Sequence, residues 1–195
     1  MRGLVVRAAA AAVVSGLCLP AAAQALRDSI RPTLEYRVKA AYLYNFLLYV
    51  TWPEEALDGS NSPLVIGVLG DDPLGTALDE VARHKRAKGR GIVVRRFESW
   101  QEDTRCHILF VPRTVSRATL TAVVQRTRGS PVLLVGETPG LATVGAPVNF
   151  YLDVDRTIGF EINVDATAER NLRVDARLLK LARIIKGPSQ DGGNG

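Results

Sequence analysis

The sequence contains very little cysteine and histidine, the residues that most often build metal sites. Its 195 residues include two cysteines, Cys18 and Cys106, and two histidines, His84 and His107. Cys106 and His107 begin an apolar run typical of a strand, so their side chains should point to opposite faces and cannot readily share one metal ion. His84 lies in a basic stretch that ends a helical pattern, where a cation suits the helix dipole. We therefore expect no metal site.

The sequence also lacks the motifs of the common catalytic sites. It has no G-x-S-x-G motif, and no serine or cysteine stands beside a recognisable general base. The neighbouring acids Glu102 and Asp103, and the pair Asp153 and Asp155, are typical of an ordinary solvated surface. We therefore expect a protein that is not an enzyme.

No nucleotide-binding motif is present. The glycine-containing turn at residues 67–75 follows an apolar run, but its spacing is not G-x-G-x-x-G. Asp71 and Asp72 would repel a phosphate at the start of the next helix, and Pro73 removes one of the N–H groups that a phosphate needs. Helix capping explains the same residues, with Asp72 as the N-cap and Pro73 at the first helical position. We expect no cofactor.

The chain has no strong excess of charge of one sign. It carries 25 lysines and arginines against 20 acids, a formal charge of +5. Two of these charges, Arg2 and Arg7, lie in the N-terminal segment, and without them 23 basic residues face 20 acidic ones, which leaves +3. The basic stretch at residues 83–96 lacks the interleaved aromatic residues of a single-strand-binding surface. We expect no nucleic-acid partner.

Residues 1–25 have the pattern of a secretory signal peptide. Arg2 and Arg7 supply positive charge, an apolar stretch continues to about Leu19, and small residues with A-x-A cleavage sites fill residues 21–25. A membrane anchor is the alternative, but the apolar stretch is shorter than the ~20 residues that a span needs. No later apolar run is long enough to cross a membrane. We expect an exported, periplasmic protein that does not span the membrane after cleavage.

Signal cleavage would leave one domain over residues 26–186 and a disordered tail over residues 187–195, which are rich in glycine and polar residues. Cys18 would leave with the signal; its use as a lipid anchor is the alternative, although Leu17 before it is not small. Cys106 would then be the single cysteine of the mature protein, so no internal disulfide can form. It is either a buried small hydrophobe or a thiol that pairs between chains.

Apolar patterns predict alternating strands and helices. Short continuous apolar runs indicate buried strands, and apolar residues at spacings of three and four indicate helices. The predicted strands are 64–69, 92–96, 107–111 and 132–135, and the predicted helices are 34–50, 74–83 and 116–128. This alternation predicts a single α/β domain with a mainly parallel sheet flanked by helices.

The C-terminal part of the chain has a different pattern. Residues 148–152 and 157–163 flank a polar turn and predict an antiparallel β-hairpin. Asp165 can cap a last helical region, whose clearest part runs over residues 175–185. The predicted domain therefore closes with a hairpin and a final helix.

The predicted helix at residues 34–50 is unusually aromatic. Six of the twelve aromatic residues of the chain lie between Tyr36 and Trp52. Aromatic residues at helical spacing usually face the core, but a contact surface is the alternative. Glu35 and Lys39 should form an i,i+4 ion pair on the same helix.

Six sets of segments, taken together, resemble the YfiR family. They occur in the order and spacing of that family and span about residues 36–186. They are Lys39–Phe46 with Thr51–Pro53, Gly67–Gly75, Cys106–Phe110, Val135–Glu137, Val148–Phe150 with Phe160–Asn163, and Leu178–Arg183. Each motif is weak alone, but six in the right order are specific. The resemblance implies a periplasmic protein with an α/β fold that is often dimeric.

The resemblance also implies a function. It is that of a repressor that binds the periplasmic sensor domain of an inner-membrane diguanylate cyclase, lowering cyclic di-GMP and biofilm formation. Redox switching through internal disulfides, known in the family, is excluded here because Cys106 stands alone in the mature chain. The alternative function is a periplasmic small-solute-binding component that acts with a membrane sensor kinase or receptor. Its ligand would sit at the carboxyl ends of the parallel strands.

A repressor of this kind needs a partner-binding surface, and such surfaces usually centre on aromatic and arginine anchors. The candidates are Tyr44, Trp52 and a face of the final helix that carries Arg177, Lys180 and Arg183. The alternative for the two aromatic residues is packing inside the core, and for the three cations it is ordinary solvation. If the interface interpretation is correct, Trp52→Ala should weaken partner binding without unfolding the domain.

Overall fold

The computed structural model describes residues 20–59, 61–100 and 105–186. The chain divides into two compact units, residues 1–32 and residues 33–195. In the first unit, the described residues are the helical residues 20–32. Most of the predicted signal peptide and all of the predicted tail lie outside the described residues. Helix α1 (Pro20–Tyr49) begins in the first unit and contributes residues 33–49 to the second, so it starts well before the predicted position 34.

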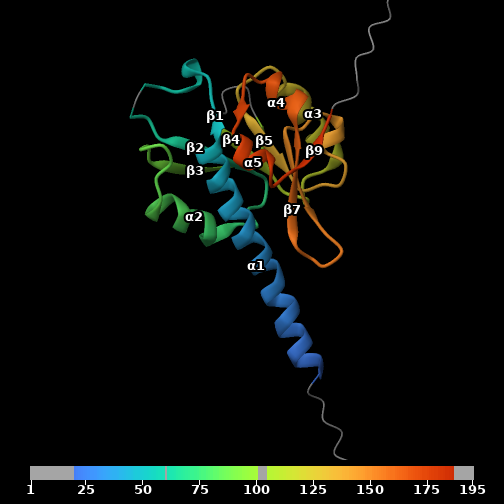
Figure 1. The fold of residues 1–195 in the computed structure, drawn as a ribbon. Coiled ribbons are helices and arrows are strands. Elements are labelled where there is room, and N and C mark those ends of the chain that lie inside the picture. The colour runs from blue at the N-terminus through green and yellow to red at the C-terminus, as the bar shows by residue number, and fades with distance from the viewer. Residues whose placement is uncertain (1–19, 60, 101–104, 187–195) are drawn as a thin grey trace, which may run out of the picture. The chain divides into compact units, whose positions relative to one another are not determined.

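The second unit is built on a seven-stranded sheet with the order β3-β2-β4-β5-β6-β7-β9 (Figure 1). The strands are β2 (Leu64–Leu69), β3 (Ile92–Phe97), β4 (Ile108–Val111), β5 (Leu133–Gly136), β6 (Val148–Leu152), β7 (Ile158–Asn163) and β9 (Arg183–Ile185). Strands β2 to β6 pair in parallel, and β6 and β7 form the predicted antiparallel hairpin. The predicted α/β fold class is therefore confirmed.

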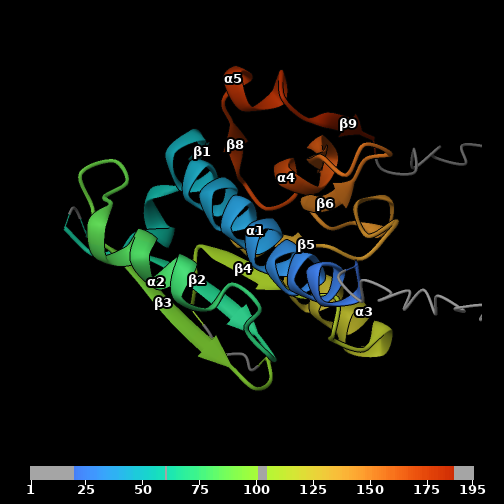
Figure 2. The same cartoon turned by 90° about the horizontal axis from the view of Figure 1, so that it is seen from below.

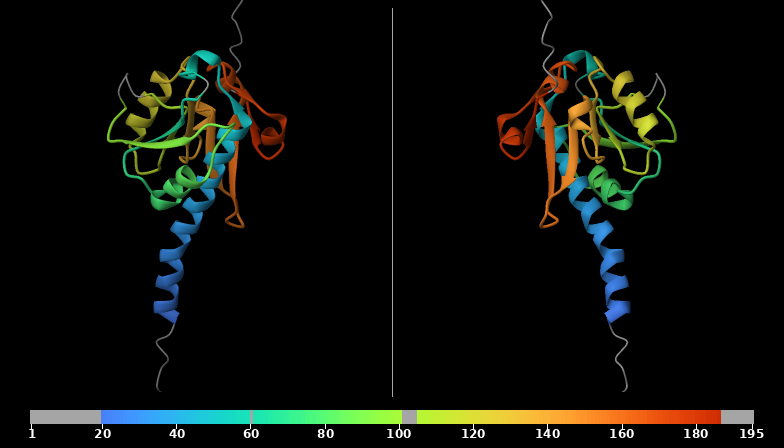
Figure 3. Two further views of the ribbon diagram at one scale, coloured as in Figure 1. Left: turned by 90° about the vertical axis from the view of Figure 1, so that its left-hand side faces the viewer. Right: turned by 90° about the vertical axis from the view of Figure 1, so that its right-hand side faces the viewer.

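Helices cover both faces of this sheet. Helix α1 and helix α2 (Gly75–His84) bury apolar side chains in one core cluster, and Figure 2 shows α1 crossing in front of β4 and β5. Helix α3 (Arg117–Arg126) packs on the other face through Leu120, Val123 and Val124, opposite α2 in Figure 3. Residues buried on both faces explain why the central strands read as continuous apolar runs.

The remaining elements are short. They are β1 (Val50–Thr51), which pairs with β8 (Arg173–Val174), the 3-10 turns η1 (Glu54–Ala56) and η2 (Ala142–Val144), and helices α4 (Val164–Ala168) and α5 (Ala176–Leu179). Among the described residues, no helix has both the length and the apolar character of a membrane span.

The aromatic side chains of α1 mostly pack in the core. Phe46 is fully buried between Phe150 and Phe160 of the hairpin, with ring centroids 5.9 Å and 5.3 Å away. Tyr42 packs against the same pair, 5.2 Å from the Phe160 ring. Because β6 and β7 place Phe150 opposite Phe160, the three elements close around one aromatic cluster.

Two of the predicted helix caps differ from the structure. Asp72 accepts hydrogen bonds from the backbone N–H groups of Leu74 and Gly75, at 2.8 Å and 3.2 Å, but α2 begins at Gly75, so Pro73 is outside the helix. Helix α4 is capped by Asn163, not by Asp165, since the Asn163 side chain accepts from the N–H of Ala166. Both side chains still satisfy free N–H groups at a helix start.

The final helix is much shorter than predicted. Asp175 caps α5, which ends at Leu179, and residues 183–185 form strand β9 instead of further helix. Strand β9 pairs in parallel with β7, where Ile184 stands opposite Ile162. The edge of β7 offered unpaired backbone groups, and the β-branched Ile184 and Ile185 suit a strand, so sheet pairing overrode the helical pattern.

Candidate functional site

Trp52 lies inside the protein and not on its surface. Its side chain is 5% exposed, and its indole N–H donates to the backbone oxygen of His107 at 3.2 Å. Its ring meets the His107 ring edge-on, with centroids 5.7 Å apart. This burial favours the core-packing alternative for Trp52, because the ring joins the end of α1 to the start of β4. The expectation that Trp52→Ala weakens partner binding without unfolding the domain stays a prediction.

Tyr44 is half-buried against the same core and reaches a different neighbour. Its hydroxyl donates to the backbone oxygen of Arg86 at 3.2 Å, in the turn after α2. Within the described ranges, no hydrogen bond or cation–ring contact joins Tyr44 to the predicted basic residues near the C-terminus. The structure therefore does not gather the predicted candidates into one site.

The three basic candidates are exposed, but they do not share a helix face. Arg177 lies in α5, Lys180 follows that helix as its C-cap, and Arg183 belongs to β9. Arg177 stacks over the Tyr49 ring at 4.9 Å and pairs with Asp175 at 2.8 Å. These contacts hold its guanidinium against the surface.

Arg183 is held in a similar way at the edge of the sheet. Its guanidinium lies 4.2 Å from the Tyr151 ring centroid, and it pairs with Glu161 at 3.6 Å. Two large apolar side chains stand beside it in the chain, Leu181 at 72% exposed and Ile184 at 43%. We call Arg177, Lys180, Leu181, Arg183 and Ile184 the C-terminal edge patch.

A second group of charges, which the sequence motifs did not single out as a site, is buried at the carboxyl ends of β4 and β5. Glu137 directly follows β5, and its carboxylate is fully buried. It accepts hydrogen bonds from Lys39 of α1, from the Arg113 backbone N–H at 2.8 Å, and from the Tyr36 hydroxyl at 3.2 Å. Glu35, whose predicted pair with Lys39 is confirmed, also pairs with the Arg113 guanidinium.

The electrostatics of this group follow from burial and pairing. Burial alone would raise the pKa of Glu137, but hydrogen bonds from Lys39 and Arg113 outweigh it and hold that pKa below its usual range. Burial, together with the nearby Glu137 carboxylate, raises the pKa of Tyr36 to about 12. Two acids face two cations here, so the group is charged yet internally balanced.

Beside this group lies a cleft of about 690 Å³ at the carboxyl ends of the strands. It is lined by Lys39, Arg113 and Glu137 and extends over β6 to Arg183. Asn149 of β6 also lines it, and its side-chain oxygen has no hydrogen-bond partner. Most of the charged side chains of this cleft bond to one another: Lys39 and Arg113 bond to Glu137, and Arg183 pairs with Glu161.

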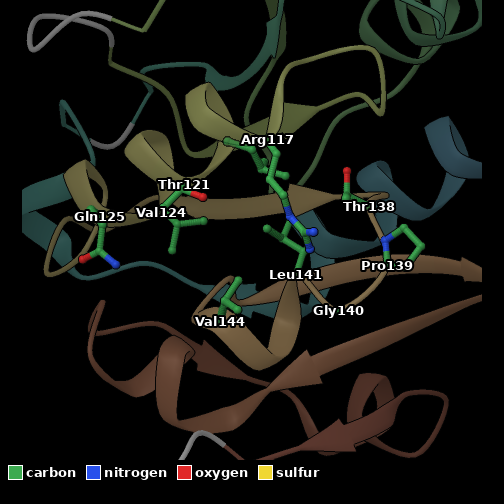
Figure 4. A pocket seen from close by; sticks show the side chains of 10 residues that line it. Arg117, Thr121, Val124, Gln125, Thr138, Pro139, Gly140, Leu141 and Val144 are labelled. Carbon is green, nitrogen blue, oxygen red and sulfur yellow. The ribbon is translucent and has the colours of Figure 1, made fainter.

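A smaller hollow of about 130 Å³ lies between α3 and residues 138–144. Figure 4 shows Arg117 reaching from α3 toward Leu141, with Val144 at the rim. Its volume fits only a few waters, far below the several hundred cubic ångströms of a ligand pocket. Elsewhere in the part of the chain that the structure describes, no three His, Cys, Asp or Glu side chains converge as metal ligands.

Cys106 is buried, as expected from its place in an apolar run. Burial raises the pKa of its thiol to about 12, so the reactive thiolate is not formed near neutral pH. A disulfide between chains through Cys106 would require the strand end to open.

The family comparison decides the class of the protein. A model of the YfiR/HmsC-like family matches residues 36–183, about three quarters of the chain. The chain belongs to the YfiR/HmsC-like family. This YfiR/HmsC-like protein is thereby a regulator in cyclic di-GMP signalling, from a family that is regulatory and not catalytic and that is generally periplasmic. No curated protein matches the sequence.

Sequence reasoning missed the buried charges of this YfiR/HmsC-like fold. Arg170 is fully buried and donates to the Ala166 oxygen at 3.0 Å and the Val124 oxygen at 3.3 Å, tying α4 to the end of α3. Burial lowers its pKa to about 10. One weak sequence signal pointed to Glu137. It directly follows a continuous apolar strand, and residues that follow parallel strands lie together at one edge of the sheet.

Proposed function

We propose that this protein binds the periplasmic sensor domain of an inner-membrane diguanylate cyclase and represses the enzyme. Family membership supports a role in cyclic di-GMP signalling, and the signal-peptide pattern supports export. The observation that carries the proposal is the C-terminal edge patch, a short exposed segment in which Leu181 and Ile184 alternate along the chain with Lys180 and Arg183.

The edge patch has the composition of a protein-binding surface. Arginine and aromatic side chains are the most enriched in interface hot spots, and exposed apolar surface rimmed by polar residues is typical of an interface. Arg177 and Arg183 are already held by Tyr49 and Tyr151, so binding them costs little side-chain entropy. The patch therefore suits a partner with an apolar surface and acidic side chains around it.

The edge strand β9 adds a second means of contact. It pairs with β7 on one side, and in the described chain nothing pairs with its other side. Unpaired N–H and C=O groups can accept a strand from another protein. With either kind of contact, the protein represses the cyclase only if it binds the inactive state of the cyclase domain more tightly than the active state.

The test is capture of the cyclase domains of the host by the purified protein, followed by titration. We expect one periplasmic domain to bind with micromolar or tighter affinity, and Leu181→Asp to weaken binding at least about tenfold, as loss of a central anchor does. Val144→Asp is the matched control because Val144 is also apolar and 57% exposed, but lies in η2. Absence of capture by folded protein, or equal weakening by both variants, would contradict the proposal.

The alternative of a solute-binding component that acts with a membrane sensor kinase or receptor receives less support from the structure. It places the ligand in the carboxyl-end cleft, where Lys39, Arg113 and Glu137 are bonded to one another. A homodimer, also implied by the family resemblance, stays a prediction. Light scattering of the purified protein measures its oligomeric state.

A further inference from the structure

A cavity larger than the cleft and the hollow described above lies at the opposite, amino ends of the parallel strands. It has a volume of about 800 Å³, within the range of small-molecule pockets. Val65 of β2, His107 before β4 and Val132 before β5 line it, so three adjacent strand starts form one wall. Trp100 and Pro131 add apolar surface around the opening.

His107 lines this cavity and has a buried ring donor without a partner. Its Nδ1 accepts a hydrogen bond from the Val65 backbone N–H at 2.9 Å, so in the neutral ring the hydrogen must be on Nε2. The side chain is only 8% exposed, and Nε2 has no hydrogen-bond partner of normal distance and angle. The Ala56 backbone still acts on the ring and favours its protonated form. A buried N–H without an acceptor costs about 1–3 kcal/mol, so an acceptor supplied by a ligand would be favoured.

Three arginines from separate elements surround the same cavity: Arg95 of β3, Arg105 before β4 and Arg126 in the last turn of α3. Arg105 pairs with Asp58 at 3.9 Å, with both side chains largely exposed. Among the described residues, no acid pairs with Arg95 or Arg126. Among the described residues, Glu55 and Asp58 are the acids that line the cavity, so three guanidinium groups face two carboxylates there.

We propose that this amino-end cavity binds a small organic anion, a molecule with an apolar body and one carboxylate or phosphate. The anion would accept from Arg95 and Arg126 and from the His107 Nε2–H, while the body lies against Trp100 and Val65. Guanidinium groups form forked hydrogen bonds with either anion, which explains why both chemistries fit. This site is independent of the proposed cyclase binding at the C-terminal edge patch.

The simplest alternative is that the arginines are ordinary solvated residues. Solvation explains Arg95 and Arg126 taken alone, but it does not explain a buried histidine donor without a partner at the wall of the same cavity. Because the three arginines come from β3, the start of β4 and α3, the fold and not the local sequence brings them together. The cavity thus has the volume of a small-molecule pocket, a histidine donor without a partner, and arginines that pair with no acid among the described residues.

The test uses the full chain and four aromatic probes of similar size. Benzoate and phenyl phosphate carry the anion, benzyl alcohol is neutral, and benzylammonium carries the opposite charge. We expect saturable calorimetric binding of at least one anion at millimolar concentration and none of the neutral or cationic probes. The imidazole ¹⁵N signal of His107 should shift on binding, and with only two histidines in the chain it can be assigned with the His84→Gln variant.

Variants locate the site. Arg95→Gln and Arg126→Gln should each weaken anion binding about tenfold, the loss expected for one charge-assisted hydrogen bond. Arg37→Gln is the matched control, since Arg37 is an exposed arginine of α1 far along the chain from the cavity residues. The proposal fails if neither anion binds, if the neutral or cationic probe binds equally well, or if all three variants bind alike.

Discussion

The two ends of the parallel strands carry similar side chains in opposite states. At the carboxyl ends, Lys39 and Arg113 are bonded to Glu137 and Glu35, and the cluster is balanced and largely buried. At the amino ends, Arg95 and Arg126 line a cavity and have no acid partner within the described residues.

The difference shows that charge at a sheet edge does not by itself make a binding site. Where acids and bases match, the hydrogen bonds are used up in holding the fold together. Where they do not match, the unused donors remain for another molecule. Ligands of open α/β sheets usually bind at the carboxyl ends, but here the arginines without an acid partner among the described residues are at the other end.

Breaking the carboxyl-end cluster should have the largest effect on stability. Lys39→Met removes a cation that pairs with the buried Glu137 carboxylate. We therefore expect a loss of about 3–5 kcal/mol in the free energy of unfolding. Urea titration measures it. The double variant Lys39→Met/Glu137→Leu should recover much of the loss, because no uncompensated charge remains. A loss below about 1 kcal/mol for Lys39→Met would show that the cluster is not structural.

Removing Trp52 should have an effect of comparable or slightly smaller size. Trp52→Ala leaves a cavity between α1 and the start of β4, and we expect a loss of about 3–5 kcal/mol. Trp52→Phe keeps most of the ring and loses the N–H donated to His107, so the expected loss is about 1–2 kcal/mol. Thermal melts of both variants test this order, and an alanine variant as stable as the parent would contradict it.

As the pH falls, the two ends of the strands should lose stability in different pH ranges. Burial lowers the pKa of His107, so the unfolded chain takes up a proton that the folded chain resists, and stability falls as the pH drops from about 6.5 toward the lower folded pKa. The pKa of Glu137 is also lowered, so its contribution is present above about 4.5 and is lost as the pH falls through the folded value.

Melting temperatures across pH 3–8 measure both steps. In His107→Asn, where the amide oxygen can still accept from the Val65 N–H, the step below about pH 6.5 should shrink. The step below about pH 4.5 should remain. If the upper step is unchanged in this variant, His107 is not its source.

The arginines of the amino-end cavity should have the smallest effect. Arg95→Gln and Arg126→Gln remove exposed side chains without a partner among the described residues, so the free energy of unfolding should change by no more than about 0.5 kcal/mol. Chemical denaturation measures it. A loss above about 1 kcal/mol would mean that these cations hold the fold, which would remove the contrast between the two ends.

Local pattern predicted the elements whose neighbours on both faces are apolar. The runs at residues 64–69 and 107–111 became β2 and β4 almost unchanged, and the hairpin of β6 and β7 appeared where the turn residues placed it. The final helix failed as a prediction because the unpaired edge of β7 decided the state of Ile184 and Ile185. Such long-range pairing leaves little trace in a local pattern.

The site residues divide in the same way. The basic C-terminal residues were predicted, and the structure exposes them, but it moves Arg183 from a helix to an edge strand. Trp52 was named for its aromatic character, and only the packing shows that its ring is buried. Whether an aromatic side chain anchors a partner or fills a core depends on what lies across from it, which spacing does not tell.

The sequence by itself determined the fold class, the resemblance to a regulatory family and the scarcity of catalytic and metal-binding residues. Apolar periodicity and ordered motifs are properties of neighbouring residues, so they can be read along the chain. Only the tertiary structure decided which charges are paired. Glu137 meets Lys39 across 98 positions, while Arg95 and Arg126 line one cavity and pair with no acid among the described residues. Pairing depends on distances in space, and those are set when the sheet and its helices pack.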